Sequence, residues 1–264
     1  MLRKNLRLFQ YEVHDFFCDE NINQLWVEYY TKIREQEAKD LDKYLFKDNS
    51  SKNFPAKLLL VKQEERLVAF TVFFEGEKSL ASIVAAYDLE FSKFSLGFFT
   101  MLLEQKYGEA SGKEYYYPGI LAKGEPKFQY KTRLGGLEFF QLKNRQWRPV
   151  EEFKAEDWIY DYMKSNILDI LVRSLDRTGL NRPTLLYEFV KPGSKEAEGL
   201  GLWGFLPSLS YLKPGGETRV FFHPFTEEYI VMNEPKTLNK EGNFRTLQFF
   251  RTKLEKEAVE AMTF

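Results

Sequence analysis

The densest group of side chains able to do chemistry lies between residues 115 and 148. It opens with three consecutive tyrosines, Tyr115–Tyr117, which alternate between faces if they form a strand, so at least one hydroxyl can point into a cleft. Basic residues then outnumber acidic ones by five, in a chain whose net charge is −1: Lys123, Lys127, Lys131, Arg133, Lys143, Arg145 and Arg148 stand against Glu125 and Glu138. This local excess favours a polyanion, whose phosphates would dominate the affinity.

Other familiar catalytic patterns do not occur in the sequence. The two histidines, His14 and His223, lie far apart, without metal-ligand spacing or a recognisable nucleophile beside them. The lone Cys18 cannot form an internal disulfide or a cysteine-based zinc site, which fits a reducing compartment. Neither a GxGxxG nor a GxxxxGKS/T pattern is present, so dinucleotide and P-loop functions lose their usual support. We therefore expect no metal and no cofactor.

Composition and charge narrow the class of protein further. The chain has 264 residues, 44% of them hydrophobic, with 38 basic and 39 acidic side chains. This composition excludes intrinsic disorder and allows one large or two small domains. No run of about 18 apolar residues exists, and the basic start lacks the apolar stretch of a secretory signal. We expect a soluble cytoplasmic protein with no membrane partner.

The elements that must position these residues follow from periodicity and turn formers. Apolar residues at three- and four-residue steps predict a helix over 22–46. Apolar and β-branched runs then predict an antiparallel meander of three strands, at 57–62, 67–74 and 80–87. A loop over 88–95 follows and runs into Gly97, where an apolar helix begins.

The remaining elements complete an order that is typical of one fold class. After that helix come a strand over 114–121, a short helix over 127–134 and a strand over 137–142. In this order a strand leads through a loop into a helix, and the strand after the helix diverges from the first strand. The loop amides face the start of the helix, so these elements form a cleft with an anion site at its base. Acyltransferases of the GNAT type are built in this order. We predict an α+β fold: a GNAT-like mixed sheet flanked by helices, with an extra C-terminal α/β lobe.

The second half of the chain carries no chemical motif. The pattern predicts an amphipathic helix over 157–175 and a closing helix over 246–262. Three strands are predicted between them, at 184–190, 219–222 and 229–232. We expect three parts: an N-terminal helical segment (1–55) packed on a GNAT-like core (56–150), and a C-terminal α/β extension (151–264).

The segment from Tyr115 to Lys131 resembles the C-terminal catalytic region of the aminoacyl-tRNA–protein transferases, the arginyl and leucyl transferases of the N-degron pathway. Members of that family carry a tyrosine-rich strand, a glycine two residues later, and a proline-lysine-aliphatic-x-tyrosine-lysine segment. The residues of this chain that match the family pattern, without a gap, are Tyr115, Tyr116, Tyr117, Gly119, Pro126, Lys127, Tyr130 and Lys131. Tyr87-Asp88, Phe94–Gly97 and the helix with Leu25-Trp26 are similar to other parts of the family, in the same order.

The resemblance implies transfer of an amino acid from an aminoacyl-tRNA to the amine of a peptide or protein N terminus. Because the donor ester is already activated, such an enzyme needs positioning, oxyanion stabilisation and removal of an amine proton. Asp88 is the expected proton acceptor or ammonium clamp, while the aminoacyl pocket or oxyanion contact is expected from Tyr116, Tyr117 and Tyr130. Contacts with tRNA phosphates are expected from Ser95, Gly97, Lys123, Lys127, Lys131 and Arg133.

Two other functions stay open. The 88–97 loop could instead hold the pyrophosphate of acetyl-CoA, which would make the chain an N-acetyltransferase, although the loop offers a single glycine, Gly97. A non-catalytic GNAT-like module that binds RNA or protein is the other. The transferred amino acid is open as well, because a cationic side chain requires a carboxylate in its pocket and leucine requires an apolar one.

Overall fold

The chain folds into two compact units in the computed structural model. The structure describes residues 1–34, 40–46, 55–119, 121–122, 130–175, 184–190, 204–213, 216–222, 224–233, 247–248 and 250–253. Unit 1 consists of three stretches, Met1–Gly119, Gln129–Leu137 and Phe250–Phe264. Unit 2 consists of Ile120–Phe128 and Glu138–Phe249. The division expected at residues 55 and 150 stays a prediction about which parts fold independently.

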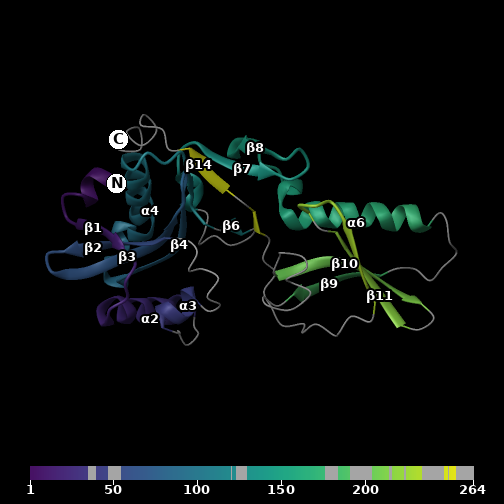
Figure 1. The fold of residues 1–264 in the computed structure, drawn as a ribbon, viewed down its shortest axis with the longest axis horizontal. Coiled ribbons are helices and arrows are strands. Elements are labelled where there is room, and N and C mark those ends of the chain that lie inside the picture. The colour runs from purple at the N-terminus through teal and green to yellow at the C-terminus, as the bar shows by residue number, and fades with distance from the viewer. Residues whose placement is uncertain are drawn as a thin grey trace. The chain divides into compact units, whose positions relative to one another are not determined.

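Unit 1 is built on a mixed sheet with the strand order β1-β2-β3-β4-β5-β14 (Figure 1). Its strands are β1 (Gln10–Asp15), β2 (Ala56–Gln63), β3 (Arg66–Glu75), β4 (Ser79–Tyr87), β5 (Tyr115–Tyr117) and β14 (Phe250–Lys253). β4 and β5 pair in parallel, and the other neighbours pair antiparallel. The predicted meander of three strands is therefore confirmed.

Helices cover both faces of this sheet. Within β3 the side chains alternate: Thr71 and Phe73 face α4 (Leu96–Ala110), whereas Phe70 and Val72 face α2 (Glu20–Arg34). Figure 1 shows these two helices on opposite sides of β1–β4. Because both faces are buried, β3 needs a continuous apolar run instead of an alternating pattern. The parallel β4–α4–β5 crossover in a mixed, helix-flanked sheet confirms the predicted α+β, GNAT-like fold.

Shorter elements complete unit 1 and differ in part from the sequence prediction. They are α1 (Leu2–Asn5), α3 (Leu41–Leu45) and the 3₁₀ helices η2 (Leu89–Phe94) and η3 (Tyr130–Arg133). The predicted single helix over 22–46 contains two helices, α2 and α3. β1 was not predicted from the sequence, because it is a short edge strand whose polar residues stay exposed or half-buried and pair with β2.

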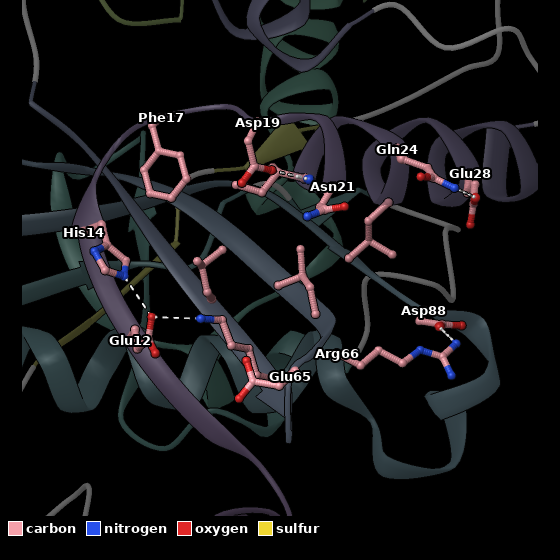
Figure 2. A pocket seen from close by; sticks show the side chains of 15 residues that line it. Glu12, His14, Phe17, Asp19, Asn21, Gln24, Glu28, Glu65, Arg66 and Asp88 are labelled. Carbon is pink, nitrogen blue, oxygen red and sulfur yellow. Dashed lines mark hydrogen bonds and ion pairs between the residues drawn. The ribbon is translucent and has the colours of Figure 1, made fainter.

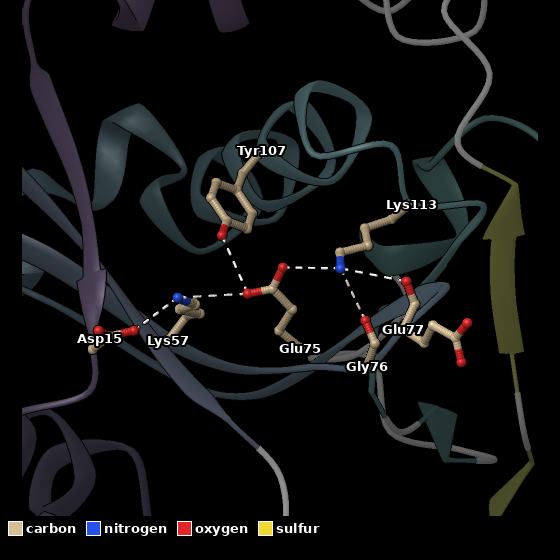
Figure 3. A network of polar contacts seen from close by, with 7 residues as sticks. All are labelled: Asp15, Lys57, Glu75, Gly76, Glu77, Tyr107 and Lys113. Atoms are coloured by element: carbon tan, nitrogen blue, oxygen red, sulfur yellow. Dashed lines mark hydrogen bonds and ion pairs between the residues drawn. The ribbon is translucent and has the colours of Figure 1, made fainter.

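A chain of charged groups ties the end of α4 to β3 (Figure 3). The Lys113 ammonium lies 2.9 Å from Glu75 and donates to the carbonyl of Gly76 at 3.0 Å. The other oxygen of Glu75 accepts from the Tyr107 hydroxyl at 3.3 Å and lies 3.6 Å from Lys57. Burial opposes ionisation of Glu75, but these cations lower its pKa overall, so the carboxylate is held in its charged form.

Unit 2 contains a four-stranded antiparallel sheet in the order β12-β11-β10-β9 and the long helix α6 (Ile159–Leu175). The strands of this sheet are β9 (Thr184–Val190), β10 (Gly204–Lys213), β11 (Gly216–Phe222) and β12 (Tyr229–Asn233). Its other elements are β6 (Leu121–Ala122), β7 (Leu137–Gln141), β8 (Gln146–Pro149), η4 (Val150–Glu152), η5 (Ala155–Asp157) and β13 (Leu247–Gln248). The predicted helix over 157–175 and the three predicted strands are confirmed, and β10 is additional.

The predicted closing helix over 246–262 is wrong where the structure describes this segment, and residues 246, 249 and 254–262 lie outside the described residues. β13 and β14 occupy its first half, and they pair with β6 and β5. Local spacing favoured a helix there, but pairing with strands far away in the sequence decides the conformation. No helix in the part of the chain that the structure describes is long and apolar enough to cross a membrane.

Candidate active site

Strands β4 and β5 diverge soon after they begin to pair. Their parallel register joins Ser79–Ala81 with Tyr115–Tyr117, and β5 ends there, whereas β4 runs on to Tyr87. The register of β4 against β3 also shifts, because Val72 pairs with Val84 but Phe73 pairs with Ser82. Ile83 is therefore an extra residue, a β-bulge, and its side chain is 43% exposed. The gap between β4 and β5 starts at Ser82.

A buried carboxylate lies behind this gap. Glu104, in the middle of α4, is completely buried, and its side chain faces the sheet. The Tyr116 hydroxyl donates to one carboxylate oxygen at 2.6 Å. The hydroxyls of Thr71 and, at 3.2 Å, Ser82 donate to the other. Three adjacent strands, β3, β4 and β5, thus each supply one hydroxyl to the same carboxylate.

The environment of Glu104 brings its ionisation into the neutral range. Burial raises the pKa of Glu104 to about 7, although the hydrogen bonds from Thr71, Tyr116 and Ser82 and the charge of Lys131 act against it. Burial and the adjacent carboxylate raise the pKa of Tyr116 well above its usual range. Glu104 therefore changes protonation state near pH 7, as general acid–base groups do.

Lys131 lies at the same gap. It sits in η3, and its ammonium donates to the carbonyl of Pro118 at 2.8 Å. Burial lowers the pKa of Lys131 to about 8, against the opposing effect of the Glu104 charge. Gly119 has φ +83°, and a Cβ there would lie 3.2 Å from the Lys131 Nζ and 3.3 Å from the Ser82 carbonyl oxygen. Glycine thus leaves room for the ammonium beside the point where β4 and β5 separate.

The N-terminus of α4 forms a second polar site, next to η3. Ser95 precedes the helix with φ +53°, and its carbonyl accepts from the amides of Phe98 and Phe99 at 3.0 Å each. The Arg133 guanidinium lies 5.0 Å from the Phe98 ring, and the Tyr130 ring packs edge-on against the same ring at 6.2 Å. Helix N-terminal amides with an adjacent guanidinium suit a phosphate.

Asp88 is placed differently from the other predicted catalytic residues. One of its oxygens accepts from the Glu90 amide at 3.0 Å, and the other lies 2.5 Å from Arg66. Figure 2 shows it at a pocket of about 590 Å³ whose lining comes from β1, β2, α2 and the turn between β2 and β3. Its described contacts are with Arg66 and Glu90, not with Tyr116 or Lys131.

The structure brings several of the predicted site residues together. Tyr116 donates a hydrogen bond to Glu104, and the charge of Lys131 acts on the same carboxylate. The pKa of Tyr130 is raised to about 12, mainly by burial and further by the charge of Glu104. Ser95 and Gly97 share the first turn of α4 with Phe98, on which Arg133 packs. Tyr117 is half-buried in β5, on the face opposite Tyr116. Lys123 and Lys127 lie outside the described residues.

Sequence reasoning missed the carboxylate and two of its partners. Glu104 follows the apolar run Met101–Leu103 on a helix that is buried almost throughout, and a charged residue there is the one signal that could have indicated it. Thr71 and Ser82 carry no such signal, because hydroxyl residues are common in strands. No cluster of three or more metal-ligating side chains occurs among the residues that the structure describes.

The helix-flanked mixed sheet and the separation of β4 from β5 define the class of fold, which is GNAT-like. Residues 21–141, from α2 to β7, match the family model described as "Arginine-tRNA-protein transferase, C terminus". This match confirms the resemblance to the aminoacyl-tRNA–protein transferase family that the sequence predicted for this region.

Solved structures with a similar fold include three acetyltransferases. The ribosomal-protein-S18-alanine N-acetyltransferase from Escherichia coli is 10% identical at a TM-score of 0.36, covering 49% of this chain and 79% of that one. An acetyltransferase from Streptococcus agalactiae 2603 is 11% identical at a TM-score of 0.36, with 56% and 93% covered. A GCN5-related N-acetyltransferase from Kribbella flavida is 11% identical at a TM-score of 0.35, with 94% and 73% covered. These likenesses are too distant to indicate a donor or an acceptor.

Proposed function

We propose that this chain transfers an amino acid from an aminoacyl-tRNA to the amine of a peptide or protein N terminus. The reaction forms an amide bond and releases the tRNA. One observation carries the proposal: the segment that resembles the transferase family supplies Tyr116, which donates to a buried carboxylate at the β4–β5 gap, and Tyr130 and Lys131, whose titration is coupled to that carboxylate. A gap with titratable groups behind it provides what aminolysis of an ester requires.

The tRNA contact is assigned to the start of α4 and the residues around it. The amides near Ser95 and Gly97, together with Arg133, would hold a phosphate close to the 3′ end of the tRNA. Lys123 and Lys127 would contact further phosphates along the backbone. The half-buried Tyr117 and the neighbouring Tyr130 would line the aminoacyl pocket.

A transfer assay with competing donors tests the proposal. The purified full chain would be incubated with a mixture of labelled aminoacyl-tRNAs and an N-terminal peptide library, and the products read by mass spectrometry. We expect peptides that gain the mass of one amino acid residue, only when charged tRNA is present. Acetylated peptides formed with acetyl-CoA would instead indicate the N-acetyltransferase function. Salt-sensitive RNA binding without any product would indicate a binding module, and either outcome would contradict the proposal.

Asp88 has a predicted role on the acceptor side of this reaction. Its side chain pairs with Arg66 and the Glu90 amide rather than with Lys131, so we assign it the clamp on the α-ammonium and not the proton acceptor. Asn can keep the backbone contact that Asp88 makes with Glu90, so Asp88→Asn removes the charge while the turn is kept. We expect the kcat/KM for the acceptor peptide to fall by about tenfold or more.

The matched control is Glu90→Gln, because Glu90 is the other carboxylate that pairs with Arg66. It should leave transfer unchanged. Equal turnover of Asp88→Asn and the unmodified chain would remove Asp88 from the reaction.

A further inference from the structure

The hydroxyl shell of Glu104 is suited to a group that changes its protonation state. All three of its partners, Thr71, Ser82 and Tyr116, are hydroxyls, and a hydroxyl can donate to a carboxylate or accept from a carboxylic acid. The Thr71 hydroxyl also has the Val84 carbonyl at 3.0 Å as a second acceptor, to which it can turn when Glu104 is protonated. The Thr71 hydroxyl therefore keeps a partner whether or not Glu104 carries a proton.

Glu75 shows what a carboxylate with a structural role looks like in this same unit. Its partners include two cations, Lys57 and Lys113, which hold it in the ionised form. Glu104 has no lysine or arginine within ion-pair distance among the described residues, and the nearest cation that influences it is Lys131. A buried carboxylate without a direct counter-ion is costly, which points to a role in chemistry.

Lys131 is a second titratable group, and it lies at the gap between β4 and β5. Its Nζ donates to the Pro118 carbonyl, an acceptor to which both the ammonium and the neutral amine have a hydrogen to donate. The room left by Gly119 lies between this Nζ and the Ser82 carbonyl, at the point where β4 and β5 part. Glu104 is completely buried, so it can act on a group at the gap only through a neighbour such as Lys131.

We propose that Lys131 is the acid–base residue of the transfer step and that Glu104 is the positioning residue that sets its charge. This inference rests on the proposed function. Among the described residues, the two other titratable groups that face the pair are Tyr116 from β5 and Tyr130 from η3, and both stay protonated at neutral pH. β3 and β4 contribute only the hydroxyls of Thr71 and Ser82.

The step balances without any further reactant. The neutral amine of the acceptor attacks the ester carbon, a C–N bond forms, and the carbonyl electron pair moves onto oxygen. The oxyanion then re-forms the C=O bond as the C–O bond to the ribose breaks, and the leaving oxygen keeps the electron pair of the broken bond and takes a proton from the Lys131 ammonium. The neutral Lys131 then takes the extra proton from the new amide nitrogen. Lys131 ends as it began, and the tRNA leaves with a free hydroxyl.

Variants of Lys131 separate this role from the phosphate contact expected from the sequence. A residue that only binds a phosphate would raise the KM for aminoacyl-tRNA when it is replaced. We expect Lys131→Met to lower kcat by about 100-fold or more with little change in that KM. Lys131→Arg keeps the positive charge but cannot release its proton near neutral pH, so it should not restore kcat.

The pH profile of kcat tests the role of Glu104. The negative charge of Glu104 favours the ammonium form of Lys131, so Glu104→Gln should lower kcat and move the alkaline limb of the profile to lower pH. Glutamine can be held by the same three hydroxyls, so the fold is kept. A purely structural glutamate would change the amount of folded enzyme without moving the limb.

Two α4 variants serve as matched controls. Lys106→Met and Glu109→Gln change the same residue types on the same helix, at positions away from the gap, and both should leave kcat and the pH profile unchanged. Thermal unfolding of every variant shows whether it is folded.

The outcomes distinguish this inference from the proposed function. Suppose that the unmodified chain transfers amino acids, but the Lys131 variants affect only KM or Glu104→Gln leaves the alkaline limb of the pH profile in place. The proposed acid–base roles of Lys131 and Glu104 are then wrong, and the proposed function stands. If the unmodified chain transfers nothing from any charged tRNA, both are wrong.

Discussion

At the scale of single residues, Glu104 is the least expected feature of the molecule. A carboxylate in the interior of an apolar helix gives up its hydration, and three neutral hydroxyls replace only part of it. The pKa of about 7 is the direct result. The same burial that raises the pKa of Glu104 therefore lowers the stability of the folded chain wherever Glu104 is ionised.

Because ionised Glu104 lowers the free energy of unfolding, the effect of Glu104→Gln on stability should depend on pH. The folded pKa of Glu104 is about 7 and the ordinary value is 4.5, so the folded state binds more protons between them. Stability that the protonated form provides is therefore lost as the pH rises toward and through 7. Relative to the unmodified chain, Glu104→Gln should gain roughly 3 kcal/mol in free energy of unfolding between pH 4 and pH 8.

Urea denaturation at several pH values measures this difference. Above pH 8 the neutralisation of Lys131 relieves part of the cost of its own burial in both proteins, so the comparison is clearest below that pH. Glu109→Gln should show no such trend. A stability difference for Glu104→Gln that is constant with pH would mean that Glu104 does not titrate with a raised pKa.

Some residues of the candidate site could be predicted from the sequence, and others could not. Tyr116, Tyr130 and Lys131 were found because their spacing in one segment is specific. Glu104 was missed because it stands alone in a different segment, and only the fold brings it to that motif. Asp88 was chosen as the carboxylate nearest to the motif in the expected loop, but its described contacts are with Arg66 and Glu90.

At the scale of elements, α4 and η3 together build both polar sites. α4 contributes its N-terminal turn to one site and Glu104 to the other, and η3 supplies Arg133 to the first and Lys131 to the second. The meander and α4 were predicted almost to the residue, because local apolar runs and turns specify them. β1 and β14 were not, because pairing with strands elsewhere in the chain specifies them.

Arg133 is expected to contribute to the tRNA contact. Arg133→Gln should raise the KM for aminoacyl-tRNA without lowering kcat, and it should reduce the slope of log affinity against log salt by about 1, as the loss of one phosphate contact does. Anisotropy titrations of tRNA at several salt concentrations measure this slope. Lys106→Gln, near the other end of α4, is the matched control and should leave the slope as it is; a similar loss in both would indicate a diffuse charge effect.

The charged chain of Figure 3 is expected to stabilise the end of α4 rather than to take part in transfer. Lys113→Met removes an ammonium whose side chain is only 12% exposed, and it leaves Glu75 with weaker partners. We expect the free energy of unfolding to fall by about 2 kcal/mol.

Lys78→Met gives the comparison for Lys113→Met, because the Lys78–Glu114 pair is far more exposed and should cost about 0.5 kcal/mol or less. Urea denaturation of both variants measures the difference. Equal losses would show that the buried position of Lys113 adds nothing.

At the scale of the whole molecule, unit 1 is discontinuous. β14 pairs with β5 through Thr252 opposite Tyr116 and Lys253 opposite Tyr115, although all of unit 2 lies between these two strands in the sequence. No local pattern could have predicted this pairing, because it joins segments more than a hundred residues apart.

The pairing predicts that β14 supports the candidate active site. Thr252→Pro places proline, which removes a backbone donor, opposite Tyr116. We expect it to lower both the thermal stability of unit 1 and the rate of transfer, because β5 loses a neighbour on the side opposite β4. Thr252→Val, which keeps a good strand former, should do neither. Full activity of the proline variant would show that β5 holds Tyr116 in place without β14.

The late position of β14 also has a consequence for biosynthesis. On the ribosome, the chain through β5 is synthesised long before β14, so the nascent sheet has an open edge beside Tyr116 during most of translation. An unpaired edge strand is a template for pairing with other chains. Newly made protein is therefore most prone to aggregation before its last strand arrives, and a chaperone that shields such edges should raise the yield of folded chain during expression.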